Sequence, residues 1–482
     1  MSGVKKLGNY IGGHECAPRS GRYLENFDPS TGEVYSLVPD SGVEDVNEAV
    51  AAAKQIFPWW AKRTPEQRSQ VMLSIANRLE QAADDLARAE SKDQGKTLHL
   101  AREIEIPRAI QNFRYFGTKI LHTESMARPT ASALHYTHRK PVGVAGLISP
   151  WNLPLYLLTW KIAPAIAAGN TVVCKPSELT PYTAYLLGEL LNEAGLPHGV
   201  VNIIFGRGSE AGAALTAHPD VPLLSFTGGT ATGRRVMEAA IPRIKKTSLE
   251  LGGKNSALVF ADCDLSEAVL GSVRAAFQNQ GEICLCNSRI LVEESIYEKF
   301  VEKFARMASF YTVGDPEAKE TQMGPLVSKE HREKVMGYIK LAVEEGGTIM
   351  AGGKIPELPA KFKGGYFLEP TVITGLKPSC RVMQEEIFGP VVSIVPFKNE
   401  AEAIEIANGV EYGLSASVFT SQVDRAHRVA QSLDVGTVWV NSWMVRDLAM
   451  PFGGVKHSGL GREGGDHSLE FFTDVKTISV KL

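Results

Sequence analysis

Two cysteines one residue apart, Cys284 and Cys286, lie in the stretch FQNQGEICLCNSR (277–289). The spacing is CxC, so the CxxC pattern of a redox pair is absent. A structural zinc site would need a second Cys or His pair at comparable spacing, and the sequence offers none. An isolated cysteine in a cytosolic protein is most often a buried structural residue, so a role as nucleophile needs support from other residues.

An asparagine and a glutamate elsewhere in the chain could assist such a nucleophile. Asn152 lies in SPWNLP (149–154), where two prolines restrict the backbone, and a rigidly held amide can donate hydrogen bonds to a developing oxyanion. A turn cap is the simpler interpretation of Asn152, and the hexapeptide alone leaves both open. Glu250 ends a predicted strand in LELGGKN (249–255), and its apolar neighbours favour the raised pKa that a general base for water requires.

A glycine-rich stretch has the residue types of a phosphate site. SFTGGTATG (225–233) places Gly228, Gly229 and Gly233 between a predicted strand and a predicted helix. Glycines there let the backbone approach a pyrophosphate that faces the helix N-terminus. A tight strand–helix turn is the alternative, but the βα context favours the phosphate.

A charged stretch, KPSE (175–178), follows the preceding predicted strand. An acidic residue after such a strand can bind ribose hydroxyls and disfavours a 2′-phosphate. Glu178 would take this role, with Lys175 beside it on the adenosine ribose. Taken alone, the stretch is equally typical of a solvated charged turn.

Strands and helices alternate with short connections from residue 141 to residue 251. Five apolar runs predict the strands, namely PVGVAGLISP, TVVCKPS, GVVNIIFG, PLLSFTGG and KKTSLELGG. Helical patterns lie between them; the clearest has Thr180 as its cap and Pro181 at its first position. This order indicates a right-handed, doubly wound parallel sheet, in which ligands bind at the carboxyl ends of the strands.

The first third of the chain is predicted to be helical. Thr64, Pro65 and Gln67 supply a cap, a first-position proline and a capping-box amide for a helix that continues to about Gly95. A second helical segment follows and contains Pro107. After residue 252 a second series of strands and helices predicts another α/β domain.

Two further strands alternate like exposed strands outside both cores: ALHYTHRK (133–140) and DVKTISVKL (474–482). Unpaired strand edges usually find a partner, so these strands are interpreted as oligomerisation elements.

The bulk composition excludes several classes of protein. The chain has 482 residues and a net charge of −3, which argues against nucleic acid as the main partner. Its longest apolar region (153–173) is broken by Lys161 and Pro164, and the N-terminus lacks the apolar core of a signal peptide, so no membrane association is expected. Six scattered cysteines form no disulfide framework, which predicts a reducing, cytoplasmic location.

Taken together, the motifs resemble the NAD(P)-dependent aldehyde dehydrogenase superfamily over essentially the whole chain. PWN, FTGG, ELGGKN, FQNQGEIC, EEIFGP and PFGGVKHSGLGRE occur in that family's order and approximate spacing. The resemblance implies a Rossmann-like doubly wound parallel sheet for NAD, a second α/β catalytic domain and a small β oligomerisation element. It also implies a homodimer or a homotetramer built as a dimer of dimers.

The resemblance assigns one nucleophile, Cys284, and leaves Cys286 without a required role. The Asn152 amide and the Cys284 backbone N–H would hold the oxyanion while hydride passes to the nicotinamide. Water activated by Glu250 would then hydrolyse the thioester. Lys161 is implied near the nicotinamide ribose and Asn152. With Glu463 it forms a candidate proton relay, although Glu463 is equally explained as a solvated loop charge.

The resemblance implies no metal and a set of residues around NAD. Glu386 would contact the ribose hydroxyls and Phe388 would pack nearby. The residues implied to bind the cofactor are Ile148, Ser149, Trp151, Lys175, Ser177, Glu178, Gly208, Phe226, Thr227, Gly228, Gly229, Gly233, Leu251, Gly252, Glu386 and Phe388. The expected domains are an NAD-binding domain (1–122 and 141–251), a catalytic domain (252–450) and oligomerisation strands (123–140 and 466–482).

Two arginines indicate the substrate. Arg108 and Arg446 fall on segments that border the substrate funnel in the family, and two guanidiniums suit an aldehyde that also has a carboxylate. Leu153 replaces the phenylalanine of the commoner PWNFP motif and would widen the funnel. Ion pairs are the alternative, Arg446 with Asp447 and Arg108 with the glutamate one turn earlier. The residues implied to bind substrate are Arg108, Asn152, Leu153, Trp160, Arg446 and Phe452.

The combination IPRAxxNFR, PWNLP, GEICLC and WxVRD resembles the muconic semialdehyde dehydrogenases within the superfamily. A retinal or general aldehyde dehydrogenase is an alternative that fits two arginines less well. A catalytically inactive structural relative would have lost the nucleophile or base, and CoA-acylating members usually lack the Glu250 carboxylate. The choice between a 2-amino and a 2-hydroxy substrate, and tolerance of NADP, stay open.

Overall fold

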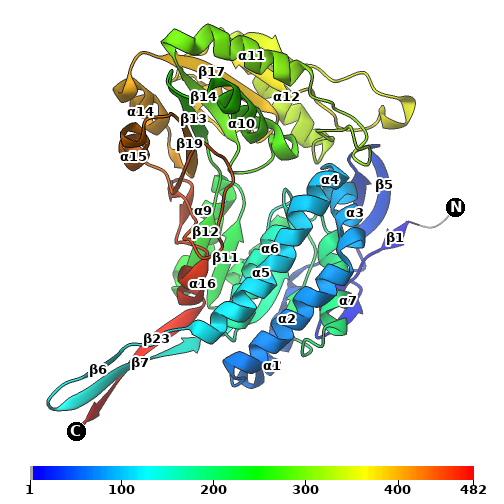
Figure 1. The fold of residues 1–482 in the computed structure, drawn as a ribbon. Helices are drawn as coiled ribbons and strands as arrows, with labels where there is room; N and C mark the ends of the chain where they lie inside the picture. The colour runs from blue at the N-terminus through cyan, green and yellow to red at the C-terminus, as the bar shows by residue number, and fades with distance from the viewer. Residues whose placement is uncertain (1–3) are drawn as a thin grey trace.

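The computed structural model describes residues 4–482, and its first large sheet contains the predicted alternating series (Figure 1). Five central strands are parallel, in the order β12-β11-β8-β9-β10. Antiparallel strands extend both edges, β22 beside β12 and the β2–β3 pair beside β10. The strands are β2 (Asn9–Ile11), β3 (His14–Cys16), β8 (Val144–Ile148), β9 (Thr171–Lys175), β10 (Val201–Ile203), β11 (Leu223–Thr227), β12 (Lys246–Glu250) and β22 (Gly459–Leu460). The doubly wound parallel sheet is confirmed, with antiparallel additions at its edges.

Helices cover both faces of this sheet because side chains alternate along each buried strand. Leu147 of β8 packs in the core formed with α2, α5, α6 and α7, whereas Val144 packs in the core formed with α1, α8 and α9. The helices are α1 (Val43–Trp60), α2 (Pro65–Gln81), α3 (Ala83–Gln94), α4 (Leu98–Leu100), α5 (Ile106–Lys119), α6 (Pro154–Ala167), α7 (Tyr182–Glu193), α8 (Ala213–Ala217) and α9 (Thr230–Ala240).

The helical first third differs from the prediction in one place. The capping box at Thr64 is confirmed, because its hydroxyl accepts from the Gln67 amide at 3.3 Å. The helix does not run unbroken to Gly95, since it stops at Gln81 and α3 begins at Ala83. Pro107 lies inside the second helical segment, as predicted, because the π-helical turn η1 (Ala101–Glu105) continues directly into α5.

The second large sheet has the order β15-β16-β17-β14-β13-β19-β20 and is parallel except at β15. Its strands are β13 (Asn255–Val259), β14 (Asn287–Glu293), β15 (Thr348–Ala351), β16 (Thr371–Thr374), β17 (Val391–Phe397), β19 (Ser415–Phe419) and β20 (Thr437–Val440). Its helices are α10 (Leu265–Phe277), α11 (Tyr297–Ser309), α12 (Lys329–Glu344), α13 (Arg381–Gln384), α14 (Glu400–Asn408) and α15 (Val423–Ser432). The predicted second α/β series is therefore present.

Three antiparallel strands form an arm that projects from the body of the molecule (Figure 1). They are β6 (Ala127–Pro129), β7 (Ala133–Pro141) and β23 (Thr473–Lys481). The predicted exposed strands thus pair with each other along their whole length. Strand structure was expected from residue 466, but residues up to Phe471 form α16 (Gly465–Phe471), whose buried Leu469 belongs to the core.

The remaining elements are short. They are β1 (Lys5–Lys6), β4 (Tyr23–Asp28), β5 (Glu33–Pro39), β18 (Tyr412–Gly413), β21 (Val455–Lys456), the π-helical turns η1 (Ala101–Glu105) and η3 (Gly208–Gly212), and the 3₁₀ turns η2 (Ile120–His122), η4 (Ile241–Arg243), η5 (Gln278–Gly281), η6 (Glu294–Ile296) and η7 (Ala360–Phe362).

Within residues 4–482, no helix has both the length and the apolar character to cross a membrane. The domain boundaries stay a prediction.

Candidate active site

Cys284 is half-buried in a cavity of about 250 Å³ between the two sheets' loops. The cavity also contains Asn152, which the sequence places more than a hundred residues away. Predicted cofactor residues complete much of its lining: Trp151, Thr227, Gly228, Gly229, Leu251, Gly252, Glu386 and Phe388. The structure thus brings the candidate nucleophile and the candidate oxyanion donor to one cavity.

A strained turn sets the position of Cys284. Asn279 and Gln280 adopt φ angles of 52° and 57°, and Gly281 follows at 69°, so three consecutive residues are left-handed. The Asn255 side chain then holds the Cys284 carbonyl at 2.6 Å. Cys286 is buried, and its thiol donates to the Gln278 carbonyl at 3.8 Å, so it faces a different partner.

The Cys284 thiol is protonated at neutral pH in the cofactor-free protein. Burial raises its pKa to about 12, the carboxylates of Glu250 and Glu386 add to this rise, and the charge of Arg446 opposes it. The thiolate is the reactive form of cysteine. Binding of cofactor and substrate must therefore favour the thiolate before Cys284 can attack.

Alkylation of Cys284 by iodoacetamide should become about tenfold faster per pH unit from pH 7 to pH 9, because the thiolate fraction rises in that proportion below the pKa. Mass spectrometry of the modified peptide measures the rate, and Cys284→Ser supplies the background. A rate that levels off below pH 9 would contradict the raised pKa.

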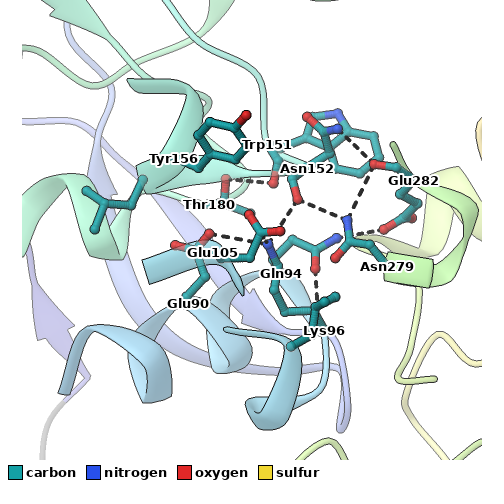
Figure 2. A network of polar contacts seen from close by, with 12 residues as sticks. Glu90, Gln94, Lys96, Glu105, Trp151, Asn152, Tyr156, Thr180, Asn279 and Glu282 are labelled. Carbon is teal, nitrogen blue, oxygen red and sulfur yellow. Dashed lines mark hydrogen bonds and ion pairs between the residues drawn. The ribbon is translucent and has the colours of Figure 1, made fainter. Parts of the chain in front are cut away.

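Asn152 has the geometry of a fixed hydrogen-bond donor (Figure 2). Its side-chain amide donates to the main-chain carbonyl of Glu282 at 2.8 Å. The main-chain carbonyl of Asn152 accepts from the side chains of Lys96 and Asn279. An amide nitrogen carries two N–H groups, so one is left for a ligand in the cavity. Asn152 does not cap α6. The N-cap of that helix is Leu153, which makes no side-chain capping hydrogen bond.

Glu250 is buried at the end of β12, and neither of its carboxylate oxygens has a hydrogen-bond partner. Burial raises its pKa well above the usual value, and the neighbouring Glu463 adds to this rise. Gly453 makes room for it, since a Cβ at that position would lie 2.8 Å from Glu250 Oε1. Such a carboxyl group is a strong proton acceptor once it ionises, as activation of water requires.

Glu463 is buried and paired, which argues against the solvated loop charge. Its carboxylate accepts from Lys161 Nζ at 3.0 Å and from the Trp160 indole at 2.7 Å, and Lys161 also donates to Ser225. Lys161 and Glu463, predicted as a candidate proton relay, are thus in contact, and Lys161 does not line the cavity of Cys284. The Trp160 N–H binds Glu463, and a contact of Trp160 with substrate stays a prediction.

A second cavity, of about 780 Å³, contains five more of the predicted cofactor residues. Ile148, Lys175, Glu178, Gly208 and Phe226 line it. Phe226 and Thr227 are adjacent on β11 and line the second and the first cavity respectively, so the two lie side by side at the carboxyl edge of the sheet. Two adjoining cavities at this edge of the sheet suit an extended dinucleotide.

Glu178 is prepared to accept hydrogen bonds. Burial acts to raise its pKa, but the Lys175 ammonium, 2.6 Å away, and the Gly208 amide outweigh burial, so the pKa lies below its usual value. Three predicted cofactor residues line neither cavity. Of these, Gly233 packs under Leu251, whose Cδ2 would lie 2.5 Å from an added Cβ; the others are Ser149 and Ser177.

Sequence reasoning missed two basic residues of the first cavity. His331 and Lys334 lie one turn apart on α12, where nothing in the sequence separates them from a solvated helix face. The His331 imidazole contacts the Phe388 carbonyl at 2.6 Å, and burial lowers its pKa to about 4, so it is neutral at pH 7. As a donor it supports Phe388, which has a φ of 62°.

Arg108 and Arg446 both contact Tyr156, a residue that the sequence analysis did not single out. Arg446 donates to the Tyr156 hydroxyl at 3.1 Å, and the Arg108 guanidinium lies 5.6 Å from the centre of the Tyr156 ring. The Arg446 guanidinium lies 3.9 Å from the centre of the Phe452 ring. Leu153 is buried in the hydrophobic core that also contains Tyr156 and Phe452.

Neither arginine has a carboxylate partner. Among residues 4–482, no Asp or Glu oxygen lies within 4.0 Å of either guanidinium, so the ion pairs with Asp447 and Glu105 are not formed. Two nitrogens of Arg108, Nε and Nη2, are buried without any hydrogen-bond partner. Buried cationic donors without a protein partner are costly, so these two nitrogens are available to an acceptor from outside the chain.

Residues 16–478 match the model of the aldehyde dehydrogenase family. The chain belongs to that family. It is 54% identical to a 2-aminomuconic semialdehyde dehydrogenase of Bos taurus, over 99% of both chains. It is 47% identical to a 2-hydroxymuconic semialdehyde dehydrogenase of Pseudomonas sp. (strain CF600), covering 99% of this chain and 100% of that one. An NAD⁺ complex of a Bacillus cereus aldehyde dehydrogenase superposes with a TM-score of 0.97 at 38% identity, covering 99% and 97% of the two chains.

The family resemblance that the motifs indicated is therefore confirmed, and with it the fold and the class of reaction. The chain is an oxidoreductase that acts on aldehydes. The roles of its individual residues are proposals.

Proposed function

We propose that this enzyme uses NAD to oxidise an aldehyde that also carries a carboxylate. The observation that carries the substrate class is the pair of arginines, Arg108 and Arg446, at Tyr156 without a carboxylate partner. The relatives named above support 2-aminomuconate 6-semialdehyde as the substrate, oxidised to 2-aminomuconate in tryptophan catabolism through kynurenine. 2-Hydroxymuconic semialdehyde is the second candidate, supported by the bacterial relative.

The chemistry is divided between residues that line the cavity and Glu250, which does not line it but whose charge acts on Cys284. The Cys284 sulfur bonds to the aldehyde carbon, and the Asn152 amide with the Cys284 backbone N–H donates to the oxyanion. NAD, when bound, supplies the hydride acceptor. Glu250 then removes a proton from the water that hydrolyses the resulting Cys284 thioester, and release of the acid restores the thiol.

The two adjoining cavities fit the cofactor. Glu178 is an ionised acceptor for ribose hydroxyls at one end, and Glu386 lies in the cavity of Cys284 at the other, where the Gly253 amide donates to it at 2.8 Å. An ionised carboxylate at the adenosine ribose favours NAD over a cofactor with a 2′-phosphate.

Arg446→Ala and Arg108→Ala should each raise KM for 2-hydroxymuconic semialdehyde by about 10- to 100-fold, because a hydrogen bond to a charged group contributes about 1.5–3 kcal/mol. KM for hexanal, a neutral aldehyde, should change less than about threefold by the same argument. Steady-state NADH formation measures both.

Arg114→Ala is the matched control on the same helix, because Arg114 pairs with Glu80 on the exposed surface. Its KM should match the parent enzyme for both aldehydes. An equal rise of KM for the charged and the neutral aldehyde in the Arg446 variant would contradict the carboxylate clamp.

A second copy of the chain is proposed to pair along the arm, giving a homodimer or a dimer of dimers. Exposed apolar side chains on β7 and β23 support this, including Tyr136, Val475 and Val480. All six cysteines are free, which supports the proposed cytoplasmic location.

A further inference from the structure

A buried lysine lies behind the candidate oxyanion donor, outside the cavity of Cys284 (Figure 2). The Lys96 side chain is fully buried. Its ammonium lies 3.3 Å from a Glu90 oxygen, 3.7 Å from a Glu105 oxygen and 3.2 Å from the main-chain oxygen of Asn152. An ammonium has three N–H groups, of which hydrogen bonds to Glu90 and Asn152 use two, while the contact with Glu105 is a longer ion pair.

Local hydrogen bonds fix the backbone of Lys96, whose side chain extends to Asn152. Gly95 ends α3 in the left-handed conformation. The Lys96 amide then donates to the Gln94 side chain at 3.0 Å, and the Ser91 hydroxyl donates to the Lys96 carbonyl at 2.6 Å. The backbone of this residue therefore has little freedom.

The two carboxylates come from different elements. Glu90 lies on α3, and Glu105 ends the π-helical turn η1, a feature that is frequent at functional sites. Burying two carboxylates and one ammonium is costly, and well-packed apolar residues often stabilise a core equally well. A role beyond stability would explain why one N–H of the Lys96 ammonium donates to the main-chain oxygen of Asn152.

The same segment is tied to the loop of Cys284. Asn279 donates to the Asn152 carbonyl at 3.1 Å, and the Gln94 side chain donates to Glu282 at 2.7 Å. Glu282 in turn offers its main-chain carbonyl to the Asn152 side chain. The loop of Asn152 is thus held from behind by Lys96 and from the side by the residues that precede Cys284.

We propose that Lys96 is a positioning residue, which fixes the Asn152 backbone so that the free amide N–H of Asn152 points at the oxyanion formed on Cys284. The inference rests on the proposed function, in particular on Asn152 as oxyanion donor. Lys96 does not touch the reacting atoms and acts only through Asn152.

The test is a double-mutant cycle on the full-length enzyme. Lys96→Met/Glu90→Gln removes the ammonium and one carboxylate together, so no net charge is added to the core. Its first-turnover rate of NADH formation, at saturating NAD and 2-hydroxymuconic semialdehyde, should fall about 10- to 100-fold, since a small misplacement of a reacting group can cost that much. In an Asn152→Ala background the same change should cost less than about threefold, because the group it positions is gone.

Alkylation of Cys284 distinguishes the positioning role from a purely structural one. Iodoacetamide alkylation needs no oxyanion donor, so under the proposal its rate should stay within about twofold of the parent in the Lys96 variant. Lys245→Met is the matched control, since Lys245 is also buried and donates to the carbonyls of Thr216 and His218. It should leave the first-turnover rate unchanged.

Equal losses in both backgrounds, or an equal loss of alkylation, would overturn the inference and leave the proposed function intact. Full activity of Asn152→Ala alone would overturn the proposed role of Asn152, and the inference with it. If the double variant does not fold, Glu105→Gln takes its place in the cycle. It frees Lys96 from one anchor and should give a smaller loss that again disappears without Asn152.

Discussion

Replacing Cys284 with alanine should lower aldehyde oxidation by at least about 10⁴-fold, because the covalent intermediate cannot form without the nucleophile. NAD binding should survive, since the cavity walls that face the cofactor come mainly from other residues. NADH formation measures the loss. Quenching of tryptophan fluorescence measures cofactor binding, because Trp151 lines the cavity.

The neighbouring cysteine supplies the control for this variant. Cys286 is buried, and its thiol bonds to the Gln278 carbonyl instead of facing Asn152. Cys286→Ala should therefore keep the oxidation rate within about threefold of the parent, the effect of one lost weak hydrogen bond. Turnover by Cys284→Ala, or an equal loss in both variants, would contradict the assignment of one nucleophile.

Glu250→Gln should separate the two halves of the reaction. The amide fills the same space but cannot accept a proton from water, so hydrolysis of the thioester should slow about 10²- to 10⁴-fold. Hydride transfer precedes that step, and one equivalent of NADH should still form rapidly. Stopped-flow absorbance measures the burst, and intact-protein mass spectrometry detects the acyl group on the enzyme.

The burst decides where Glu250 acts. A variant that forms neither the rapid NADH nor the acyl-enzyme would show that Glu250 is needed before hydride transfer, for instance to deprotonate Cys284.

Sequence reasoning predicted the parts of the fold with regular patterns. The five parallel strands of the first sheet alternate with helices along the chain, and this alternation predicted the parallel sheet. Thr180 was expected to cap the helix after β9, but the N-cap of α7 is Pro181 and no side chain caps that helix. The edge strand β22 has only two residues, Gly459 and Leu460, and two residues carry no periodicity. The helical segment around Pro107 was predicted, but its π-helical turn η1 was not, because such a turn has no composition of its own.

The candidate site shows a similar division. Cys284, Asn152 and Glu250 have motifs that mark them individually. The partners of Arg108 and Arg446 could not be predicted, because nearness in sequence favoured Glu105 and Asp447 whereas the fold brings Tyr156 to both. Lys161 and Glu463 were named together as a candidate proton relay, and the structure places the two side chains 3.0 Å apart. The relay itself stays a proposal.

The central claim is that an aldehyde with a carboxylate is the substrate. Its most direct test is NADH formation by the unmodified enzyme with 2-hydroxymuconic semialdehyde and with the methyl ester of the same compound, a neutral molecule of nearly equal size. The account predicts a kcat/KM at least about 100-fold higher for the free acid, because only the acid gives both arginines an anionic acceptor. Equal kcat/KM values for the acid and the ester would contradict it.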